Sequence, residues 1–452
     1  MQDVILLLLL MALLVVVGSL LRRAPPFKEM QTRLAAAKWA LVRDFSAALR
    51  QDVVVTDRVT AHHLLVRRGA GGAFCNRPPT STASSVLSRQ RHHNIGSAPY
   101  GALWRGIRRN LVSEVFHPSR LRVYAPARRR ALCGLVADLR EQCKSSNDGL
   151  VFAALPALTE LIYRDRWNKL VTLRRQQEEM YLPLVNARRG LLRRPSGEAP
   201  TYVDTLIELL VPDDSHFDSG AKASKQRLTD GELVGLCSEF LGAGTEPATA
   251  ALQWVMANLV KHVDVQEAVR SEIDAFVGAD AEEVSEDDLG KLEYLNAVLM
   301  EALRLHPTVP SVARQVMPDD HVFLDGRRVA AGTTVQFPLE RLARDETAWA
   351  EPDKFAPERF LAGGGGDGVS LVAAAGSAGE IKMMPFGAGR RMCPGMGVAM
   401  LHLGYFVANL VREFEWTEAE GDLAVDLEPQ VGFLNVMERP LRALLKLRNK
   451  RA

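Results

Sequence analysis

Residues 386–395 read FGAGRRMCPG, a glycine-rich loop that holds one cysteine and precedes a long apolar run. Glycines let a backbone approach another group closely, and backbone N–H groups placed in this way stabilise a sulfur as a thiolate. The positive end of the helix predicted after Pro394 acts in the same direction, as do the charges of Arg390 and Arg391. The stretch therefore predicts that Cys393 binds a soft or borderline metal, whereas most single cysteines are small buried apolar groups.

This loop resembles the haem-binding loop of cytochromes P450, which follows the pattern F-x-x-G-x-R-x-C-x-G. Every fixed position is filled, by Phe386, Gly389, Arg391, Cys393 and Gly395. A match of this length rarely arises by chance, and cysteine-ligated haem is the known use of such a loop. The resemblance implies haem b (iron protoporphyrin IX) as the cofactor, with Cys393 as the ligand of its iron.

The composition is that of a globular chain, with 452 residues, 47% of them hydrophobic and 24% charged. The net charge is +2 and no basic tract with interleaved aromatic residues is present, so we expect no nucleic-acid partner. The five cysteines are odd in number, far apart and without metal-binding spacing. This pattern predicts neither a disulfide framework nor a structural zinc, and it fits a reducing compartment such as the cytosol.

Val4–Leu21 is almost wholly apolar, and as a helix it would span ~27 Å, close to the hydrocarbon thickness of a bilayer. Arg22 and Arg23 follow at once, which favours a signal anchor at residues 1–23 with the rest of the chain in the cytosol. A cleaved signal peptide is the alternative, but the basic n-region is missing and the run is long. With the resemblance, this predicts a single-pass protein of the endoplasmic reticulum membrane.

Leu228–Lys261 is predicted to be one long helix that begins with a capping box and is apolar on most sides, hence buried. Its middle resembles the oxygen-binding segment of the same family, (A/G)-G-x-(D/E)-T-T. Ala243 and Gly244 have little side chain, so the helix could lie against a flat cofactor there. By the resemblance, Glu246 supplies the acid of a proton relay.

Pro247 stands where the family places a threonine directly after the acid. Proline lacks the N–H that would bond to the carbonyl of Ala243, so it preserves a kink yet removes the hydroxyl. Thr245, Thr249 or a water could replace that hydroxyl, although Thr249 is turned about 200° around the helix from Pro247. We expect oxygen cleavage to be less well coupled than in a typical relative, and a harmless kink is the alternative.

Two motifs resemble the groups that hold the haem propionates in the family. Trp104 and Arg108 are four residues apart and share a helix face, as in the family helix that contacts a propionate. Arg314 falls where the family carries an Arg or His that points toward a propionate. The alternatives are an ordinary basic helix face for the first motif and a solvated strand residue for the second.

A third motif is structural. Glu301 and Arg304 lie three apart on one predicted helix face, and Arg359 follows in the segment Pro357–Phe360. A single E-x-x-R is usually a surface ion pair of small energetic value. In this context the three residues resemble the Glu–Arg–Arg triad of the family, which locks a helix to the loop before the haem segment.

The connecting segments are predicted from their composition. Asp325–Gly326 indicates a tight hairpin, and Pro429–Lys446 a second hairpin. Ala70–Thr82 is predicted to be a loop, Pro195–Lys225 a polar connector, and Gly363–Glu380 a flexible surface insertion of low complexity.

The motifs occur in family order from Trp104 to the C-terminus. The sequence most resembles the plant members of the family that lie in the endoplasmic reticulum. The implied fold is mainly α with small β-sheets. It is a cytochrome P450-like single large domain, residues 24–452, joined to the N-terminal membrane anchor. Residues 24–60 match the family less well, and a truncated sequence is one explanation.

The implied activity is that of a haem-thiolate monooxygenase, which inserts one oxygen atom of O2 into a small lipophilic substrate, here in plant secondary metabolism. Electrons would come from NADPH through a partner, NADPH-cytochrome P450 reductase, because the chain has no nicotinamide or flavin motif in the right context. Two alternatives remain: a haem-thiolate isomerase or dehydratase without O2 activation, and a haem-binding paralogue without turnover. Pro247 motivates both.

Overall fold

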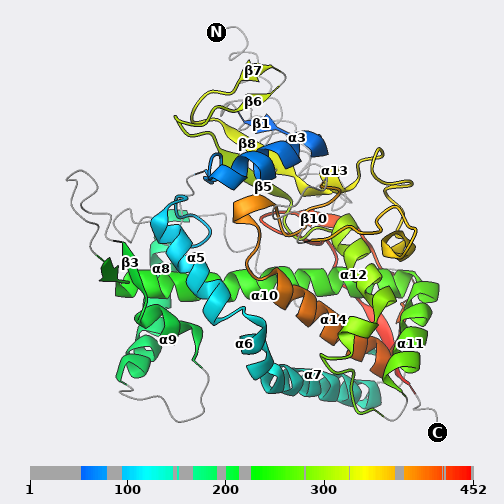
Figure 1. Ribbon diagram of the computed structural model, residues 1–452. Helices are drawn as coiled ribbons and strands as arrows, with labels where there is room; N and C mark the ends of the chain where they lie inside the picture. Colours follow the sequence, from blue (N-terminus) through cyan, green and yellow to red (C-terminus); the bar gives the residue numbers. More distant parts are fainter. Residues whose placement is uncertain are drawn as a thin grey trace, which may run out of the picture. The chain divides into compact units, whose positions relative to one another are not determined.

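Helix α10 (Asp230–Lys261) is the longest of the described helices, and much of the fold packs around it (Figure 1). The predicted capping box is present at its N-terminus. The hydroxyl of Thr229 accepts a hydrogen bond from the N–H of Glu232 (3.3 Å), and the Glu232 carboxylate accepts one from the N–H of Thr229 (2.7 Å). Two of the first free N–H groups of the helix are thereby satisfied, which fixes where α10 begins.

The main apolar core lies against the C-terminal half of α10. Trp254 and Val255 of this half are buried together with side chains of helices α11 (Val263–Val277), α12 (Glu293–Leu305) and α14 (Met396–Glu413). Because α14 starts just after the cysteine loop (Phe386–Gly395), this packing ties the loop to the core.

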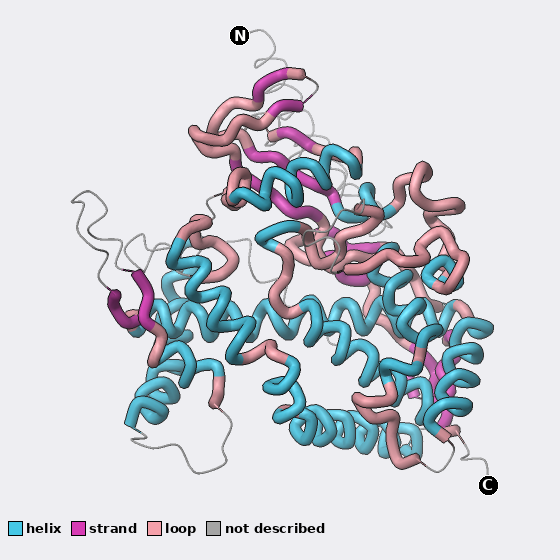
Figure 2. Tube along the Cα trace, in the orientation of Figure 1, coloured by secondary structure: helices cyan, strands magenta, loops and turns pink. Residues whose placement is uncertain are grey.

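The computed structural model describes residues 52–78, 94–145, 150–151, 166–190, 200–212, 225–278, 281–324, 326–371, 381–419, 421 and 424–448. The elements belong to one compact unit that starts at Val53. It is mainly helical with small sheets, as predicted (Figure 2). The remaining helices and single helical turns are α3 (Arg58–His62), η1 (His63–Arg68), η2 (Gly69–Gly71), α5 (Ala102–Glu114), α6 (Pro118–Val123), α7 (Ala125–Ser145), α8 (Arg166–Gly190), α9 (Tyr202–Ile207), η5 (Leu289–Lys291), α13 (Leu339–Ala343), η6 (Pro357–Phe360) and η8 (Gly389–Arg391).

The strands form small separate sheets. One three-stranded sheet has the order β1-β8-β5, with β1 parallel and β5 antiparallel to β8, and the other has the order β2-β12-β9. Three antiparallel pairs, β3–β4, β6–β7 and β10–β11, complete the described strands. Their bounds are β1 (Val53–Val54), β2 (Leu150–Val151), β3 (Leu210–Pro212), β4 (Lys225–Arg227), β5 (Ser311–Gln315), β6 (Phe323–Leu324), β7 (Arg327–Arg328), β8 (Thr334–Pro338), β9 (Phe414–Glu418), β10 (Pro429–Val431), β11 (Asn435–Met437) and β12 (Ala443–Leu447).

Both predicted hairpins are confirmed, with one change. Strands β6 and β7 pair through Leu324 and Arg327, and Gly326 before β7 has a φ of +74° that favours glycine. The C-terminal hairpin is β10–β11 and ends at Met437, because β12 pairs with β9 and β2 instead. The prediction that Pro195–Lys225 is only a connector was wrong, since α9 and β3 lie within it.

The prediction of a flexible insertion at Gly363–Glu380 was wrong for its first part. The N–H of Gly366 donates to the carbonyl of Arg359 (2.7 Å), and a Cβ added to Gly364 would overlap the same carbonyl. Glycines serve here to let two backbone segments approach closely. Residues 372–380 lie outside the described residues.

None of the helices within the described residues is both long and apolar enough to cross a lipid bilayer. The predicted anchor, Val4–Leu21, lies outside these residues, as do residues 24–51 of the poorly matched segment 24–60.

Candidate active site

The cysteine loop is closed by its own backbone. The N–H of Cys393 donates to the carbonyl of Phe386 (2.8 Å), and that of Met392 donates to Gly389 (3.0 Å). Gly389 has a φ of +66°, in the left-handed region that favours glycine. Gly395 then starts α14, and its N–H donates to the sulfur of Cys393. The sulfur thus sits at the positive end of α14, as the sequence predicts.

The charges around Cys393 differ from the prediction. Burial raises the pKa of the Cys393 thiol, and the Gly395 N–H and the cations Arg108 and Arg77 act against that rise. Arg390 does not contribute, because its guanidinium donates to the carbonyl of Ala70 (2.6 Å). Arg391, the other predicted cation, also points elsewhere. The favourable charge therefore comes from Arg108 and Arg77, which are distant from Cys393 in the sequence.

Trp104 joins the α5 helix to the cysteine loop. Two guanidinium groups lie over its ring, that of Arg391 at 4.4 Å and that of Arg108 at 5.2 Å from the ring centroid. Its indole N–H donates to the carbonyl of Ile95 (3.1 Å), and Arg108 donates to the carbonyl of Met392 (2.5 Å). The structure therefore brings together three residues of the predicted site from separate parts of the chain.

Four guanidinium groups gather in this region: Arg77, Arg108, Arg314 and Arg391, here called the arginine cluster. Arg314 and Arg391 are only 3% and 4% exposed, so Arg314 is not a solvated strand residue. The pKa of Arg314 falls to about 9 and that of Arg391 to about 10, first because burial removes hydration and then because Arg77 lies nearby. Within the described chain none of the four forms an ion pair, so the cluster has unbalanced positive charge.

The arginine cluster is held by backbone carbonyls. Arg391 donates to the carbonyls of Cys75 (2.9 Å) and Ala98 (2.6 Å), and Arg77 donates to Gly96 (3.0 Å). Arg77 keeps exposed surface, although partial burial lowers the pKa of its guanidinium. Buried cations require an anion, and the two propionates of haem have the charge that this cluster lacks.

The middle of α10 is open. Glu232–Leu236 and most of Ala250–Val260 are buried, whereas Leu241–Glu246 are exposed. A Cβ added to Gly244 would meet no heavy atom within 4 Å, so nothing described covers this face. A long helix with buried ends and a bare middle of small residues fits a flat group lying against Ala243 and Gly244. The prediction that α10 is buried throughout was wrong at this place.

The threonines near Pro247 are engaged with the helix. The hydroxyl of Thr245 donates to the carbonyl of Leu241 (2.7 Å), and that of Thr249 donates to the carbonyl of Thr245 (3.0 Å). Both side chains are exposed, and each hydroxyl keeps an acceptor site. Glu246 is exposed on the same open stretch.

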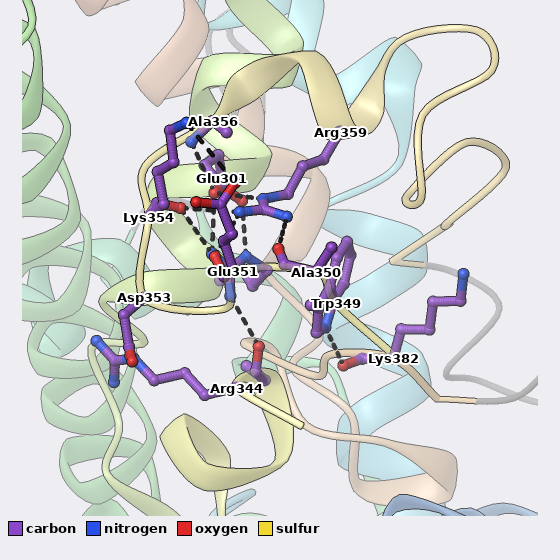
Figure 3. A network of polar contacts seen from close by, with 12 residues as sticks. Glu301, Arg344, Trp349, Ala350, Glu351, Asp353, Lys354, Ala356, Arg359 and Lys382 are labelled. Carbon is purple, nitrogen blue, oxygen red and sulfur yellow. Dashed lines mark hydrogen bonds and ion pairs between the residues drawn. The ribbon is translucent and has the colours of Figure 1, made fainter. Parts of the chain in front are cut away.

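The predicted triad is formed. Glu301 accepts two hydrogen bonds from Arg304 (2.7 and 2.9 Å) and one from Arg359 (3.1 Å), and it also accepts the N–H of Ala356 (2.9 Å). Glu301 and Arg304 are 0% exposed. Figure 3 shows the Glu301 carboxylate facing Arg359 and Ala356, so that α12 is joined to the turn η6. The guanidinium of Arg304 also lies 5.2 Å from the ring of Trp349.

Comparison with known proteins agrees with this geometry. The sequence profile of the Cytochrome P450 family matches residues 148–444. The chain belongs to the cytochrome P450 family. Cytochrome P450 89A9 of Arabidopsis thaliana is 36% identical over 451 residues, which span 89% of this chain and 85% of the relative. Cytochrome P450 78A9 of the same plant is 28% identical, over 83% of this chain and 75% of the relative. Cytochrome P450 78A1 of Zea mays is 28% identical, over 93% of this chain and 80% of the relative.

Sequence reasoning missed two residues of this P450 site. Arg77 lies in the segment predicted to be a loop, and Glu239 lies on α10 two residues before the open stretch. A sequence signal existed for the second, because an acid in the apolar interior of a helix needs a buried partner. Arg77 carried no comparable signal.

Gly389 gives a prediction about the stability of this P450. A Cβ at this position would overlap the carbonyl oxygen of Leu65, and the φ of +66° is strained for any other residue. We expect Gly389→Ala to lower the free energy of unfolding by about 3 kcal/mol, measured by denaturant titration. The control is Gly134→Ala in α7, where nothing lies within 4 Å and the change should stabilise by about 0.5–1 kcal/mol. Equal effects of both changes would contradict the close approach.

Proposed function

We propose that this P450 is a haem-thiolate monooxygenase that inserts one oxygen atom of O2 into a small lipophilic substrate. The observation that carries the proposal is the joint presence of the Cys393 sulfur, the unbalanced arginine cluster and the bare middle of α10. Leu241, 51% exposed beside Ala243, makes the open helix face apolar, which supports a lipophilic substrate.

The residues present fit haem. The sulfur of Cys393 would bind its iron, the arginine cluster and Trp104 would hold its propionates, and Ala243 with Gly244 would lie against its flat face. When bound, haem with a thiolate ligand supplies O2 activation. Phe386 and Gly389 keep the shape of the loop, and Gly395 donates the N–H that stabilises the sulfur.

The remaining roles belong to this chain's own polar groups. Glu246 on the open stretch of α10 would deliver protons, with the hydroxyls of Thr245 and Thr249 as relay groups. Both hydroxyls donate to helix carbonyls, so each can accept a hydrogen bond but must turn away from its carbonyl to donate one. Proton delivery is therefore expected to be slower than with a threonine at position 247.

Electrons would come from NADPH through NADPH-cytochrome P450 reductase. The chain would be held at the endoplasmic reticulum membrane by Val4–Leu21, with residues 24–452 in the cytosol. The similarity to plant relatives supports this placement, because it extends over most of the chain.

Two measurements test the proposed function. The protein expressed with haem precursor should show the reduced-CO absorption spectrum of thiolate-ligated haem. With the reductase and a panel of lipophilic plant metabolites, it should then consume NADPH and release oxygenated product. A CO spectrum without NADPH consumption, but with conversion of an already oxygenated substrate, would favour an isomerase or dehydratase, which Pro247 motivates. A spectrum with neither reaction would favour the non-catalytic paralogue.

Pro247 gives a prediction about coupling. Changing Pro247→Thr restores the hydroxyl beside Glu246, so the peroxide released per NADPH should fall severalfold, as measured in the reconstituted system. The control is Pro247→Ala, which restores the helix N–H without the hydroxyl. If alanine lowers the peroxide yield as much as threonine does, the missing hydroxyl is not the cause.

A further inference from the structure

The residues Asn94–Ala98 form a tight turn beside the arginine cluster. The N–H of Ala98 donates to the carbonyl of Asn94 (3.0 Å), and the side chain of Asn94 accepts the N–H of Ser97 (3.1 Å). These bonds fix the directions of the carbonyl and N–H groups of the turn. The turn is therefore a rigid platform, with its carbonyls available to donors on one side.

The carbonyls of the Asn94–Ala98 turn hold cationic and aromatic groups of the site. The carbonyl of Ile95 accepts from Trp104 (3.1 Å) and from Arg391 (3.2 Å). The carbonyl of Gly96 accepts from Arg77 (3.0 Å), and that of Ala98 from Arg391 (2.6 Å). The position of this turn thus determines where the two guanidinium groups and the indole lie.

The opposite side of the turn is held by one carboxylate. The two oxygens of Glu239, on α10, accept the N–H groups of Ile95 (2.7 Å) and Gly96 (2.5 Å). Burial raises the pKa of Glu239, while these two N–H groups, Arg77 and Arg391 oppose the rise. A carboxylate taken out of water at such a cost needs the compensation that the turn and the cations provide.

Glu239 is also the carboxylate whose charge acts on the arginine cluster. Burial lowers the pKa of Arg77, and the charge of Glu239 opposes this fall. The peptide groups between them are aligned so that N–H groups face the anion and carbonyls face the cations. This arrangement stabilises both ends of the turn.

We infer that Glu239 is a positioning residue of this P450: by holding the Asn94–Ala98 turn and offsetting part of the cluster's charge, it sets the geometry and the electrostatic potential that bound haem experiences. The inference rests on the proposed function for the haem itself. It assigns to α10 a second role, besides the bare face at Ala243 and Gly244.

The test separates charge from reach with two variants of the full-length protein loaded with haem. Glu239→Gln keeps the length and removes the charge, so the reduction potential of the haem should become more positive, because less negative charge lies near the added electron. Glu239→Asp keeps the charge but is too short for both N–H groups, so the potential should shift less than in Glu239→Gln.

The second readout is hydrogen exchange of the backbone amides of residues 94–98. Both variants should exchange faster there, by about five-fold for each hydrogen bond of ordinary strength that is lost. Gly96→Ala gives an independent check, because an added Cβ would lie 2.6 Å from the Glu239 carboxylate oxygen. It should speed exchange like Glu239→Asp while the charge remains.

The matched control is Asp204→Asn. Asp204 is another buried carboxylate that accepts a backbone N–H, that of Thr201 (2.7 Å), and it binds Arg188 (2.6 Å) away from the cluster. It should leave the haem potential and the exchange at 94–98 unchanged. An unchanged potential in Glu239→Gln, or unchanged exchange in all variants of Glu239 and Gly96, would overturn the inference. If the wild type bound no haem, the proposed function would fail, and amide exchange would still decide whether Glu239 holds the turn.

Discussion

Replacing Cys393 with alanine is expected to abolish monooxygenase activity and the thiolate signature of the reduced-CO spectrum. The sulfur of Cys393 is the one thiolate that the cysteine loop can offer, and it is surrounded by the N–H of Gly395 and the charges of Arg108 and Arg77. Alanine leaves the loop backbone intact but offers no ligand. The measurement is the absorption spectrum together with product formation in the presence of reductase.

The control for this change is Cys143→Ala. Cys143 is partly buried and its sulfur donates to the carbonyl of Leu445 (3.7 Å) in the β2-β12-β9 sheet. This variant should keep the spectrum and the activity of the wild type. An unchanged CO spectrum after loss of Cys393 would contradict the proposed ligand and, with it, the haem-thiolate chemistry.

Replacing Glu301 with alanine is expected to lower the free energy of unfolding by about 3–5 kcal/mol. The carboxylate is 0% exposed and accepts hydrogen bonds from Arg304, Arg359 and the N–H of Ala356. Its removal leaves the guanidinium of Arg304 buried without an anion, at 0% exposure. Because the triad joins α12 to η6, we also expect the cysteine loop to bind haem less tightly. Denaturant titration measures the stability, and the rate of haem transfer to an acceptor protein measures the affinity.

An exposed ion pair provides the comparison. Arg175 and Glu179 of α8 are four residues apart, and their side chains are 82% and 66% exposed. Glu179→Ala should change the stability by no more than about 0.5 kcal/mol. If both substitutions had similar small effects, the triad would be an ordinary surface pair and would not hold the loop in place.

The parts of the site that sequence predicts are those encoded within one short segment. The cysteine loop, the capping box of α10 and the pair Glu301–Arg304 depend on spacing over a few residues, and the structure forms each of them. Spacing along one helix or loop fixes which side chains share a face, so no long-range information is required.

The parts that sequence did not predict depend on contacts between distant segments. Glu239 meets Gly96 across 143 residues, and Arg391 meets Cys75 across 316. No periodicity encodes such pairs. The directions of Arg390 and Arg391 were wrong for the same reason, since a long side chain reaches whichever carbonyl the fold brings near, here those of Ala70 and Cys75.

The glycine-rich segment at residues 363–366 shows a different limit. Low complexity normally indicates a flexible linker, but Gly364 and Gly366 lie against the backbone of Arg359 and the ring of Trp349. Glycine permits both flexibility and close packing, so composition alone does not decide between them.

The arginine cluster also has a consequence for the life of the newly made protein. Four like charges with only the Glu239 carboxylate to offset them oppose completion of the fold. A ligand that binds only the folded chain stabilises it by an amount that rises with the logarithm of the free ligand concentration. We therefore expect the supply of haem in the cell to govern how much of this protein accumulates. Cells that lack haem should degrade more of the newly synthesised chain.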